Sequence, residues 1–305
     1  MGQVTTHVMM IRPSAFGYNA ETAQNNAFQH NPGVDKSGEV SEKALSEFEE
    51  FVQLLQKEGI SVTVLEDSKT PLKPDAVFPN NWISFHEDGT IVTYPMYSTL
   101  RRKERREDLI NDLKSSFQIL HQIHLEDFEN HHQYLEGTGS LVLDRVNKIA
   151  YACISERTDR ELLKEWCERM GYIPHTFSAV SNGKPIYHTN VMMAIGTKIV
   201  VACLECLPDM NERNALKEQL SRHHEVVEIT DEQVQSFAGN MLALKNNNGE
   251  ELMVMSSRAL ASLTEQQKKT IEKYSRIVAS PIQTIEDVGG GSARCMIAEV
   301  FLDPK

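Results

Sequence analysis

The chain has 305 residues, of which 40% are hydrophobic, and this length is enough to bury a large core. Its formal net charge of −12 repels phosphate backbones and anionic membrane surfaces, so we expect neither a nucleic-acid partner nor a membrane partner. No apolar run of about 18 residues is present, and the N-terminus lacks the basic and apolar segments of a secretory signal. Five cysteines, an odd number in a long chain, favour a reducing compartment, and we predict a cytoplasmic location.

Strand-like apolar runs alternate with amphipathic helical patterns along the chain. The first strand is expected at residues 7–11, and the first helix at residues 41–58, where apolar side chains share one face. Later helical patterns lie near residues 102–115, 160–170, 210–223 and 265–274. The basic run at residues 101–106 is interrupted by an acid, and we interpret it as a solvated helix start. Two helix starts are typical of capping boxes: Thr158 with Glu161, and Thr264 with Gln267.

Five segments share one pattern, a small or polar cluster followed by a β-rich apolar run. They begin at Pro79, Glu136, His188, Ala238 and Ala293. Four of them continue through a turn into a second apolar run, which predicts four hairpins with turns at residues 88–89, 146–147, 196–197 and 248–249. The last polar residue of each cluster gives five equivalent positions, about 50 to 60 residues apart: Asn81, Gly139, Asn190, Asn240 and Cys295.

The repeats predict a ring of five units, each made of strands and a helix. The fifth unit lacks a second strand, which the N-terminal run can supply, and pairing of the chain ends would leave few exposed edges. We therefore predict an α/β fold, a pseudo-fivefold five-bladed propeller of ββαβ-type units in a single domain of residues 1–305. A two-domain doubly wound fold is the alternative, but no Gly-rich phosphate loop follows an early strand. In the ring, the polar clusters would converge on one central cavity.

The cluster ends carry residues that could perform chemistry. Cys295 follows three glycines at residues 289–291, and such a loop lets the backbone approach another group closely. Its thiol could face the cavity, or it could be a buried cysteine that acts as a small hydrophobe. His188 could shuttle protons for a cysteine nucleophile, and Glu136 beside a glycine could orient and charge-stabilise that histidine. Structural roles remain open for both at this point.

A metal site is not expected from the sequence. Cys203 and Cys206 form a C-x-x-C pattern, but no second such pair completes four ligands, and we interpret both as structural. Neither a metal nor an organic cofactor is therefore predicted.

Three motifs in this order resemble those of the guanidino-group-modifying superfamily, the penteins, which includes arginine deiminases, dimethylarginine hydrolases and amidinotransferases. They are Glu136-Gly137, His188-x-Asn190, and Gly290-Gly291 with Arg294-Cys295-Met296, and the likeness spans residues 75–296. Ser155-Glu156-Arg157-Thr158 is similar to the S-E-R-T stretch of arginine deiminases. The resemblance implies the same five-bladed fold and a role in arginine metabolism.

The resemblance also implies roles for single residues. Cys295 matches the family nucleophile, His188 its acid–base residue and Glu136 its orienting carboxylate. Arg157 and Arg101 match arginines that hold the α-carboxylate of the substrate, a task that suits a bidentate guanidinium.

The chain departs from the family where a guanidinium would bind. Phe78-Pro79-Asn80-Asn81 stands where arginine deiminases have F-x-R-D and dimethylarginine hydrolases F-V-E-D, so Asn81 replaces a carboxylate. Asn190 replaces a second aspartate, and Gly139 replaces the aspartate of E-G-G-D. A buried cation needs a compensating charge, whereas an amide can donate to a C=O group and accept from an N–H group. We therefore expect Asn80, Asn81 and Asn190 to bind a neutral ureido group.

The best candidate is a cysteine hydrolase that converts citrulline to ornithine, carbon dioxide and ammonia through a covalent S-linked intermediate. This also resembles a subgroup of the superfamily thought to hydrolyse citrulline. An arginine deiminase or dimethylarginine dimethylaminohydrolase, an amidinotransferase and a non-catalytic binding protein remain alternatives. The expected partner is a small amino-acid substrate, and the sequence leaves a homo-oligomer open.

Overall fold

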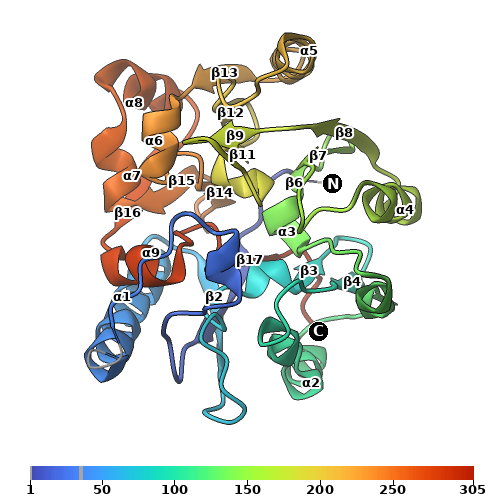
Figure 1. The fold of residues 1–305 in the computed structure, drawn as a ribbon, viewed down its shortest axis with the longest axis vertical. Helices are drawn as coiled ribbons and strands as arrows, with labels where there is room; N and C mark the ends of the chain where they lie inside the picture. The colour runs from blue at the N-terminus through green and yellow to red at the C-terminus, as the bar shows by residue number, and fades with distance from the viewer. Residues whose placement is uncertain (1, 34–36) are drawn as a thin grey trace.

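The structure is a computed structural model that describes residues 2–33 and 37–305. Its strands form five three-stranded sheets and one two-stranded ribbon, with most of the long helices at the periphery (Figure 1). This arrangement confirms an α/β fold built from repeated units of strands and helices. Residues 1 and 34–36, which the expected domain of residues 1–305 includes, lie outside the described residues.

Each three-stranded sheet has the same topology, in which the middle strand pairs antiparallel with one neighbour and parallel with the other. Four sheets follow the chain: β3 (Ile83–Phe85), β4 (Thr90–Thr93) and β5 (His121–His124); β6 (Val142–Asp144), β7 (Ile149–Cys153) and β8 (Ile173–Phe177); β11 (Met193–Ile195), β12 (Ile199–Ala202) and β13 (Glu225–Glu228); β14 (Leu242–Lys245), β15 (Glu251–Ser256) and β16 (Arg276–Ser280). The antiparallel pair that opens each of them is one of the four predicted hairpins, and all four are confirmed.

The fifth sheet joins the two ends of the chain. It places β1 (His7–Arg12) between β17 (Ala298–Val300) and β2 (Ser61–Glu66). His7 pairs antiparallel with Val300, so the predicted pairing of the chain ends is confirmed. The hydrogen bonds of the ladders stay within each sheet, and the described strands form no continuous closed sheet.

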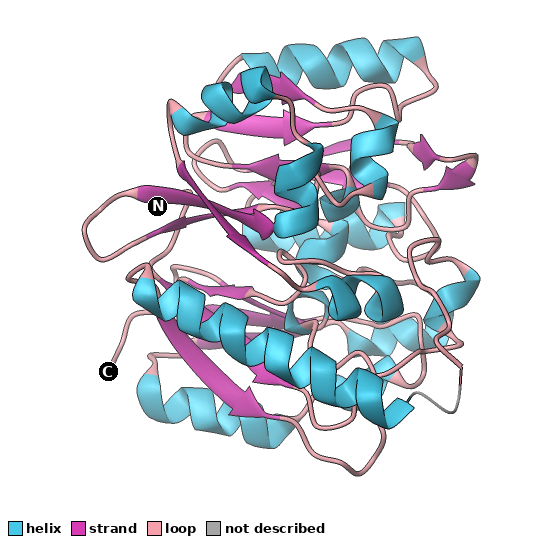
Figure 2. Cartoon of the chain, turned by 90° about the vertical axis from the view of Figure 1, so that its left-hand side faces the viewer, coloured by secondary structure: helices cyan, strands magenta, loops and turns pink. Residues whose placement is uncertain are grey.

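Four of the expected helices form close to their predicted bounds: α1 (Ser37–Lys57), α4 (Arg160–Met170), α5 (Met210–Ser221) and α8 (Glu265–Glu272). Helix α1 packs against β2 and β16 and crosses the outside of the strands in Figure 2. The shorter elements are η1 (Thr22–Gln24), η3 (Pro79–Asn81), η5 (Glu126–His131), α3 (Gly137–Ser140), β9 (Val180–Ser181), β10 (Lys184–Pro185), η6 (Thr189–Val191), α6 (Asp231–Gln235), α7 (Ser257–Ser262) and α9 (Gln283–Gly289).

Two local predictions need correction. The helix expected at residues 102–115 is divided into η4 (Arg101–Glu104) and α2 (Glu107–Ser116), because Arg105 is extended with ψ 96°. The capping box at Thr264 is confirmed. The one at Thr158 is wrong, because Asp159 is the N-cap of α4 and accepts the N–H of Leu162.

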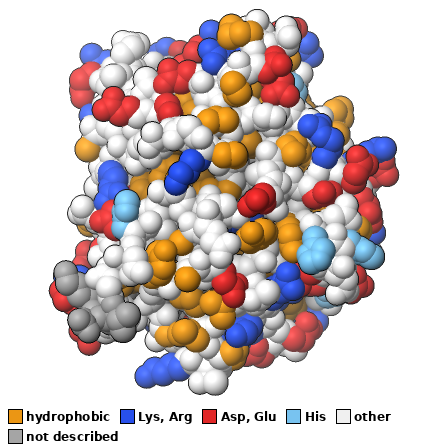
Figure 3. All heavy atoms as spheres, in the orientation of Figure 1, with side chains coloured by type: hydrophobic (Ala, Val, Ile, Leu, Met, Phe, Trp, Pro, Cys, Tyr) orange, Lys and Arg blue, Asp and Glu red, His pale blue; other side chains and the backbone are white. Residues whose placement is uncertain are grey.

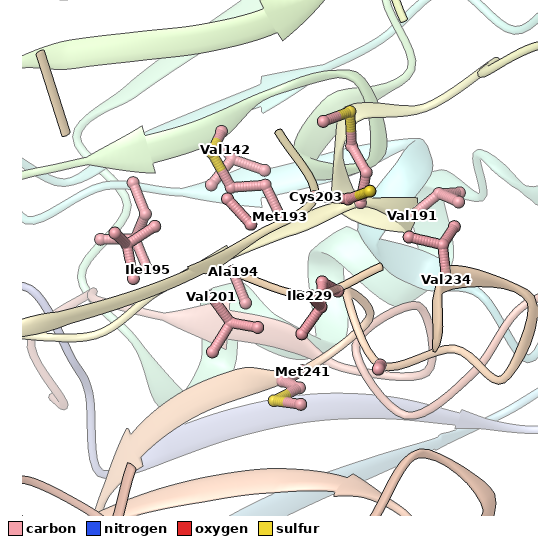
Figure 4. Close-up of a cluster of buried hydrophobic side chains, with 14 of the residues drawn as sticks. Val142, Val191, Met193, Ala194, Ile195, Val201, Cys203, Ile229, Val234 and Met241 are labelled. Atoms are coloured by element: carbon pink, nitrogen blue, oxygen red, sulfur yellow. The ribbon is translucent and has the colours of Figure 1, made fainter. Parts of the chain in front are cut away.

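The apolar faces of neighbouring sheets pack directly against each other. Met193 and Ala194 of β11 lie between Val142 of β6 and Met241, which precedes β14 (Figure 4). All four are less than 9% exposed, and burial of each large aliphatic side chain contributes about 1.5–3 kcal/mol. This packing fixes the ends of strands that belong to different repeats.

The surface mixes charges of both signs on the face shown in Figure 3. None of the described helices is long and apolar enough to cross a membrane.

Candidate active site

The five equivalent positions of the repeat lie together at the ends of their strands. Asn81 in η3 and His188, which precedes η6, meet over Gly139 in α3. A Cβ on Gly139 would lie 2.3 Å from Asn81 Nδ2 and 2.8 Å from His188 Nδ1. On the other side, Asn190 and Asn240 both contact the sulfur of Cys295. The repeat therefore correctly predicts which distant residues become neighbours.

One cavity is lined jointly by Cys295, His188, Asn81, Arg101 and Arg157. Asn81 and Arg101 belong to the first unit of the repeat, Arg157 to the second, His188 to the third and Cys295 to the fifth. All five are buried, so a ligand here would be largely removed from water. The structure thus brings most of the predicted site residues to a single place.

His188 and Glu136 form a buried pair, with His188 Nε2 2.7 Å from Glu136 Oε2. Burial lowers the pKa of His188 to about 4, against the opposing effect of Glu136. Burial alone would raise the pKa of Glu136, but the charge of Arg157 and the bond from His188 lower it to about 2. At neutral pH the pair is therefore a neutral imidazole that donates to a carboxylate. With its proton on Nε2, the ring has only Nδ1 left to accept another.

Cys295 lies directly after the glycine loop, with its thiol between two amides. Asn240 Nδ2 lies 3.3 Å from Cys295 Sγ, and Asn190 Nδ2 lies 3.5 Å from it. The loop approaches its surroundings closely, as predicted. Gly290 has φ +65°, and a Cβ there would lie 2.6 Å from Asn26 Nδ2. A side chain at this position would be strained and would also clash.

Arg101 is buried, which corrects the interpretation of residues 101–106 as a wholly solvated run. Its Nη1 donates to Asn81 Oδ1 at 2.7 Å, and its Nε and Nη2 each donate to Glu104 at 2.9 Å. Burial raises the pKa of Glu104 to about 7, although Arg101 opposes this shift. Every nitrogen of this guanidinium therefore has a protein partner. One of these partners is Asn81, whose amide is oriented by the bond from Arg101.

Arg157 is held differently, mainly by neutral oxygens of the N-terminal loop. It donates to Asn25 Oδ1 from Nε at 2.9 Å and to the carbonyl of Thr22 at 3.0 Å. Its Nη1 lies 3.6 Å from Glu136, and its guanidinium lies 4.7 Å above the ring of Tyr187. Local patterns did not single out Thr22 as a contact, because it lies 135 residues away in sequence.

Several buried polar atoms in Asp75 and Asn81, which line the cavity, and in the predicted site residues Asn80 and Asn190 have no hydrogen-bond partner. They are Asn81 Nδ2, Asn190 Oδ1, both side-chain atoms of Asn80, and Asp75 Oδ1. The other oxygen of Asp75 accepts from Asn19 Nδ2 at 2.7 Å. Asp75 also lines the cavity, although the sequence did not predict it as a site residue. The feature that could have indicated it is a single carboxylate in the apolar segment that precedes Phe78. Because buried polar atoms are rarely unpaired, these are candidate contacts for a ligand.

Comparison with known families identifies the chain. The family model described as N,N dimethylarginine dimethylhydrolase, eukaryotic, matches residues 12–302. The chain belongs to this family. It is thereby a member of the guanidino-group-modifying superfamily, and the family is one of hydrolases that act on C–N bonds. No curated protein matches the chain by sequence.

Solved structures share the fold of this family member. The N-terminal domain of ArgZ, an arginine dihydrolase from the ornithine–ammonia cycle in cyanobacteria, has a TM-score of 0.73 at 15% identity. The match covers 96% of this chain and 97% of that domain, but 40% of the complete ArgZ chain. A dimethylarginine dimethylaminohydrolase adduct with S-methyl-L-thiocitrulline has a TM-score of 0.65 at 14% identity, with 97% and 100% of the two chains covered.

No group of three or more potential metal ligands occurs within residues 2–33 and 37–305. The polar side chains that line the cavity include amides, guanidinium groups, a carboxylate and the imidazole of His188. The arrangement is suited to covalent chemistry by a thiol beside a neutral imidazole.

Proposed function

We propose that this protein is a cysteine-dependent hydrolase that cleaves a C–N bond in the ureido group of citrulline and yields ornithine, carbon dioxide and ammonia. Cys295 is the nucleophile, His188 the acid–base residue and Glu136 the carboxylate that stabilises its charged form. The observation that carries the proposal is a pair of unpartnered amide atoms, a donor on Asn81, which lines the cavity, and an acceptor on Asn190, which contacts Cys295.

The orientation of the Asn81 amide follows from its neighbour, and the Asn190 amide has its nitrogen toward the sulfur of Cys295. Arg101 can only donate, so the Asn81 atom that it contacts is the oxygen, and the free atom is the N–H donor. Asn190 directs its nitrogen toward Cys295 and keeps its oxygen free as an acceptor. A ureido group matches this pair, because its carbonyl accepts and its NH₂ donates. A guanidinium has no acceptor and would leave the buried N–H of Asn81 unpaired, at a cost of about 1–3 kcal/mol.

The proposed reaction has two steps. The proton of the Cys295 thiol passes to His188 Nδ1, and the thiolate attacks the ureido carbon. The protonated His188 then donates to the departing nitrogen, so that ammonia leaves and an S-linked carbamoyl intermediate remains. Water, deprotonated by His188, attacks this intermediate and restores the thiol. The released carbamate decomposes to ornithine and carbon dioxide.

We assign the substrate α-carboxylate to Arg157. Its contacts with Asn25 and Thr22 are to neutral oxygens, which a carboxylate can replace with stronger charge-assisted bonds. Arg101 stays in the proposed binding set because it orients Asn81, and Asn80 because its amide has no partner.

A guanidine substrate is the second candidate. Asp75 Oδ1 has no partner and could receive a guanidinium N–H group. ArgZ, whose N-terminal domain shares this fold, is an arginine dihydrolase. However, burial raises the pKa of Asp75, which weakens its ability to hold a cation. This candidate therefore ranks below citrulline.

We also propose that residues 1–305 form one domain in which the five sheets are the blades of a propeller around this cavity. The pairing of β1 with β17 and the convergence of the five equivalent positions support this arrangement. The five cysteines are free, which supports the proposed cytoplasmic location.

The test is incubation of the purified protein with citrulline or arginine, with ornithine, citrulline and ammonia measured by mass spectrometry and an ammonia assay. We expect ornithine from citrulline, none with Cys295→Ser, and full activity with Cys167→Ser, a buried cysteine of α4. Citrulline or ornithine formed from arginine, with added citrulline untouched, would favour the guanidine candidate. Normal turnover by Cys295→Ser would overturn the mechanism.

A further inference from the structure

Asn240 is fully buried directly before β14, and the proposed function gives it no role. The repeat places it at the position equivalent to Asn81, Asn190 and Cys295. Its side chain bonds to groups on two neighbouring repeats, η6 and the segment around Cys295.

The orientation of the Asn240 amide is determined by two backbone groups. Its Oδ1 accepts the N–H of Arg294 at 3.1 Å, and its Nδ2 donates to the carbonyl of Asn190 at 2.9 Å. An N–H group can only donate and a carbonyl can only accept, so the amide cannot be flipped without the loss of both bonds. The second hydrogen of Nδ2 is therefore directed to Cys295 Sγ, 3.3 Å away.

The sulfur meets more donors than acceptors. Asn240 and Asn190 each direct an N–H group at Cys295 Sγ. Within the described part of the chain, the protonated thiol has a single acceptor, Asn240 Oδ1 at 3.6 Å, and that oxygen already accepts from Arg294. Hydrogen bonds to an ionised acceptor are about twice as strong as those to a neutral one, so two donors favour the thiolate.

Among the described residues, no cationic group forms a hydrogen bond to the sulfur. Burial lowers the pKa of His188 to about 4, so the imidazole is neutral at neutral pH. The guanidinium of Arg294 bonds to the carbonyl of Ile297 at 2.9 Å and to Glu299 at 2.5 Å instead of the sulfur. Arg101 and Arg157 line the same cavity, but the hydrogen bonds directed at the sulfur come from neutral amides.

We propose that Asn240 is a further catalytic residue, whose fixed amide N–H stabilises the Cys295 thiolate before it attacks the substrate. This role rests on the proposed function, in which Cys295 is the nucleophile.

The experiment measures the rate of Cys295 alkylation by iodoacetamide as a function of pH, with the modified peptide quantified by mass spectrometry. Asn240→Asp keeps an acceptor for Arg294 but replaces the donor with a negative charge. Asn240→Ser shortens the side chain and removes the fixed N–H. We expect the pH midpoint of alkylation to rise by about one unit in Asn240→Ser and by more in Asn240→Asp, so that alkylation near pH 7 falls at least about tenfold.

Asn247→Asp is the matched control, because it adds the same charge on an exposed hairpin turn and should leave the midpoint unchanged. If Asn240→Asp does not fold, Asn240→Ser carries the test. A folded Asn240→Ser variant whose rate falls equally at every pH, with the wild-type midpoint, would reduce Asn240 to a structural role and overturn the inference. Alkylation needs no substrate, so a shifted midpoint in a protein that turns over neither citrulline nor arginine would support the Asn240 role while the proposed function fails.

Discussion

Replacement of Asn81 by Asp tests the polarity argument for the substrate most directly. Arg101 can still donate to one carboxylate oxygen at the position now 2.7 Å from Nη1, so the change keeps that contact. The other oxygen takes the place of the free N–H of Asn81 and faces the ureido carbonyl with a like partial charge. Loss of a buried donor costs about 1–3 kcal/mol, which corresponds to a fall of about 5- to 150-fold in kcat/KM for citrulline.

The same change provides an acceptor for a guanidinium. We therefore expect the ratio of kcat/KM for citrulline to that for arginine to fall by at least the same factor in Asn81→Asp. Both constants follow from ornithine and citrulline measured under steady-state conditions, and Asn247→Asp controls for the added charge. An unchanged ratio in a folded Asn81→Asp variant would refute the assignment of Asn81 as the donor to the ureido oxygen.

Two further predictions concern stability. The pKa of His188 is lowered to about 4 and that of Glu136 to about 2, so the unfolded chain binds more protons than the folded protein below about pH 6.5, the usual His value. Stability should therefore fall with decreasing pH, by up to about 3 kcal/mol from His188 between pH 6.5 and 4, and then further as Glu136 loses its contribution between about pH 4.3 and 2. Urea denaturation at pH 7 and 5 should show a smaller loss for His188→Gln than for the wild type, and equal losses would contradict the role of burial. Gly290→Ala should destabilise the protein by about 1–2 kcal/mol in the same assay, because Gly290 has a φ of +65°. Gly17→Ala is the control and should have little effect, because a Cβ there meets open space. Equal effects of the two changes would argue against strain in the glycine loop.

The parts of the fold that the sequence predicted well depend on local chemistry. A turn such as Asp88-Gly89 or Asn248-Gly249 between two apolar runs determines a hairpin, whatever lies elsewhere in the chain. Helix α4 was predicted with its observed bounds because an apolar face ends at Gly171, which adopts φ +69° as a C-cap. The equivalence of the five cluster ends followed from the repeat itself.

The parts that were missed depend on contacts between distant segments. Nothing in the basic run shows that Arg101 is buried, because its partner Asn81 lies 20 residues earlier, before β3 of the same unit. The contact of Asn25 with Arg157 crosses 132 residues. Asn25 appeared in the sequence as one polar loop residue among several. Such contacts become predictable only when the arrangement of the repeats around the cavity is known.

Two of the three departures from the family motifs, Asn81 and Gly139, are structurally connected. The amide nitrogen of Asn81 lies 2.3 Å from the position that a Cβ on residue 139 would occupy, and His188 lies 2.8 Å from it. Any side chain at Gly139 would displace the group proposed to bind the ureido oxygen. An aspartate at position 139 is therefore incompatible with Asn81 in its present place. The glycine at position 139 leaves room for the amide that stands at position 81 in place of the family carboxylate. A single substitution of Gly139 by aspartate could not restore a guanidinium site here. The substitution of Asn81 has to come first.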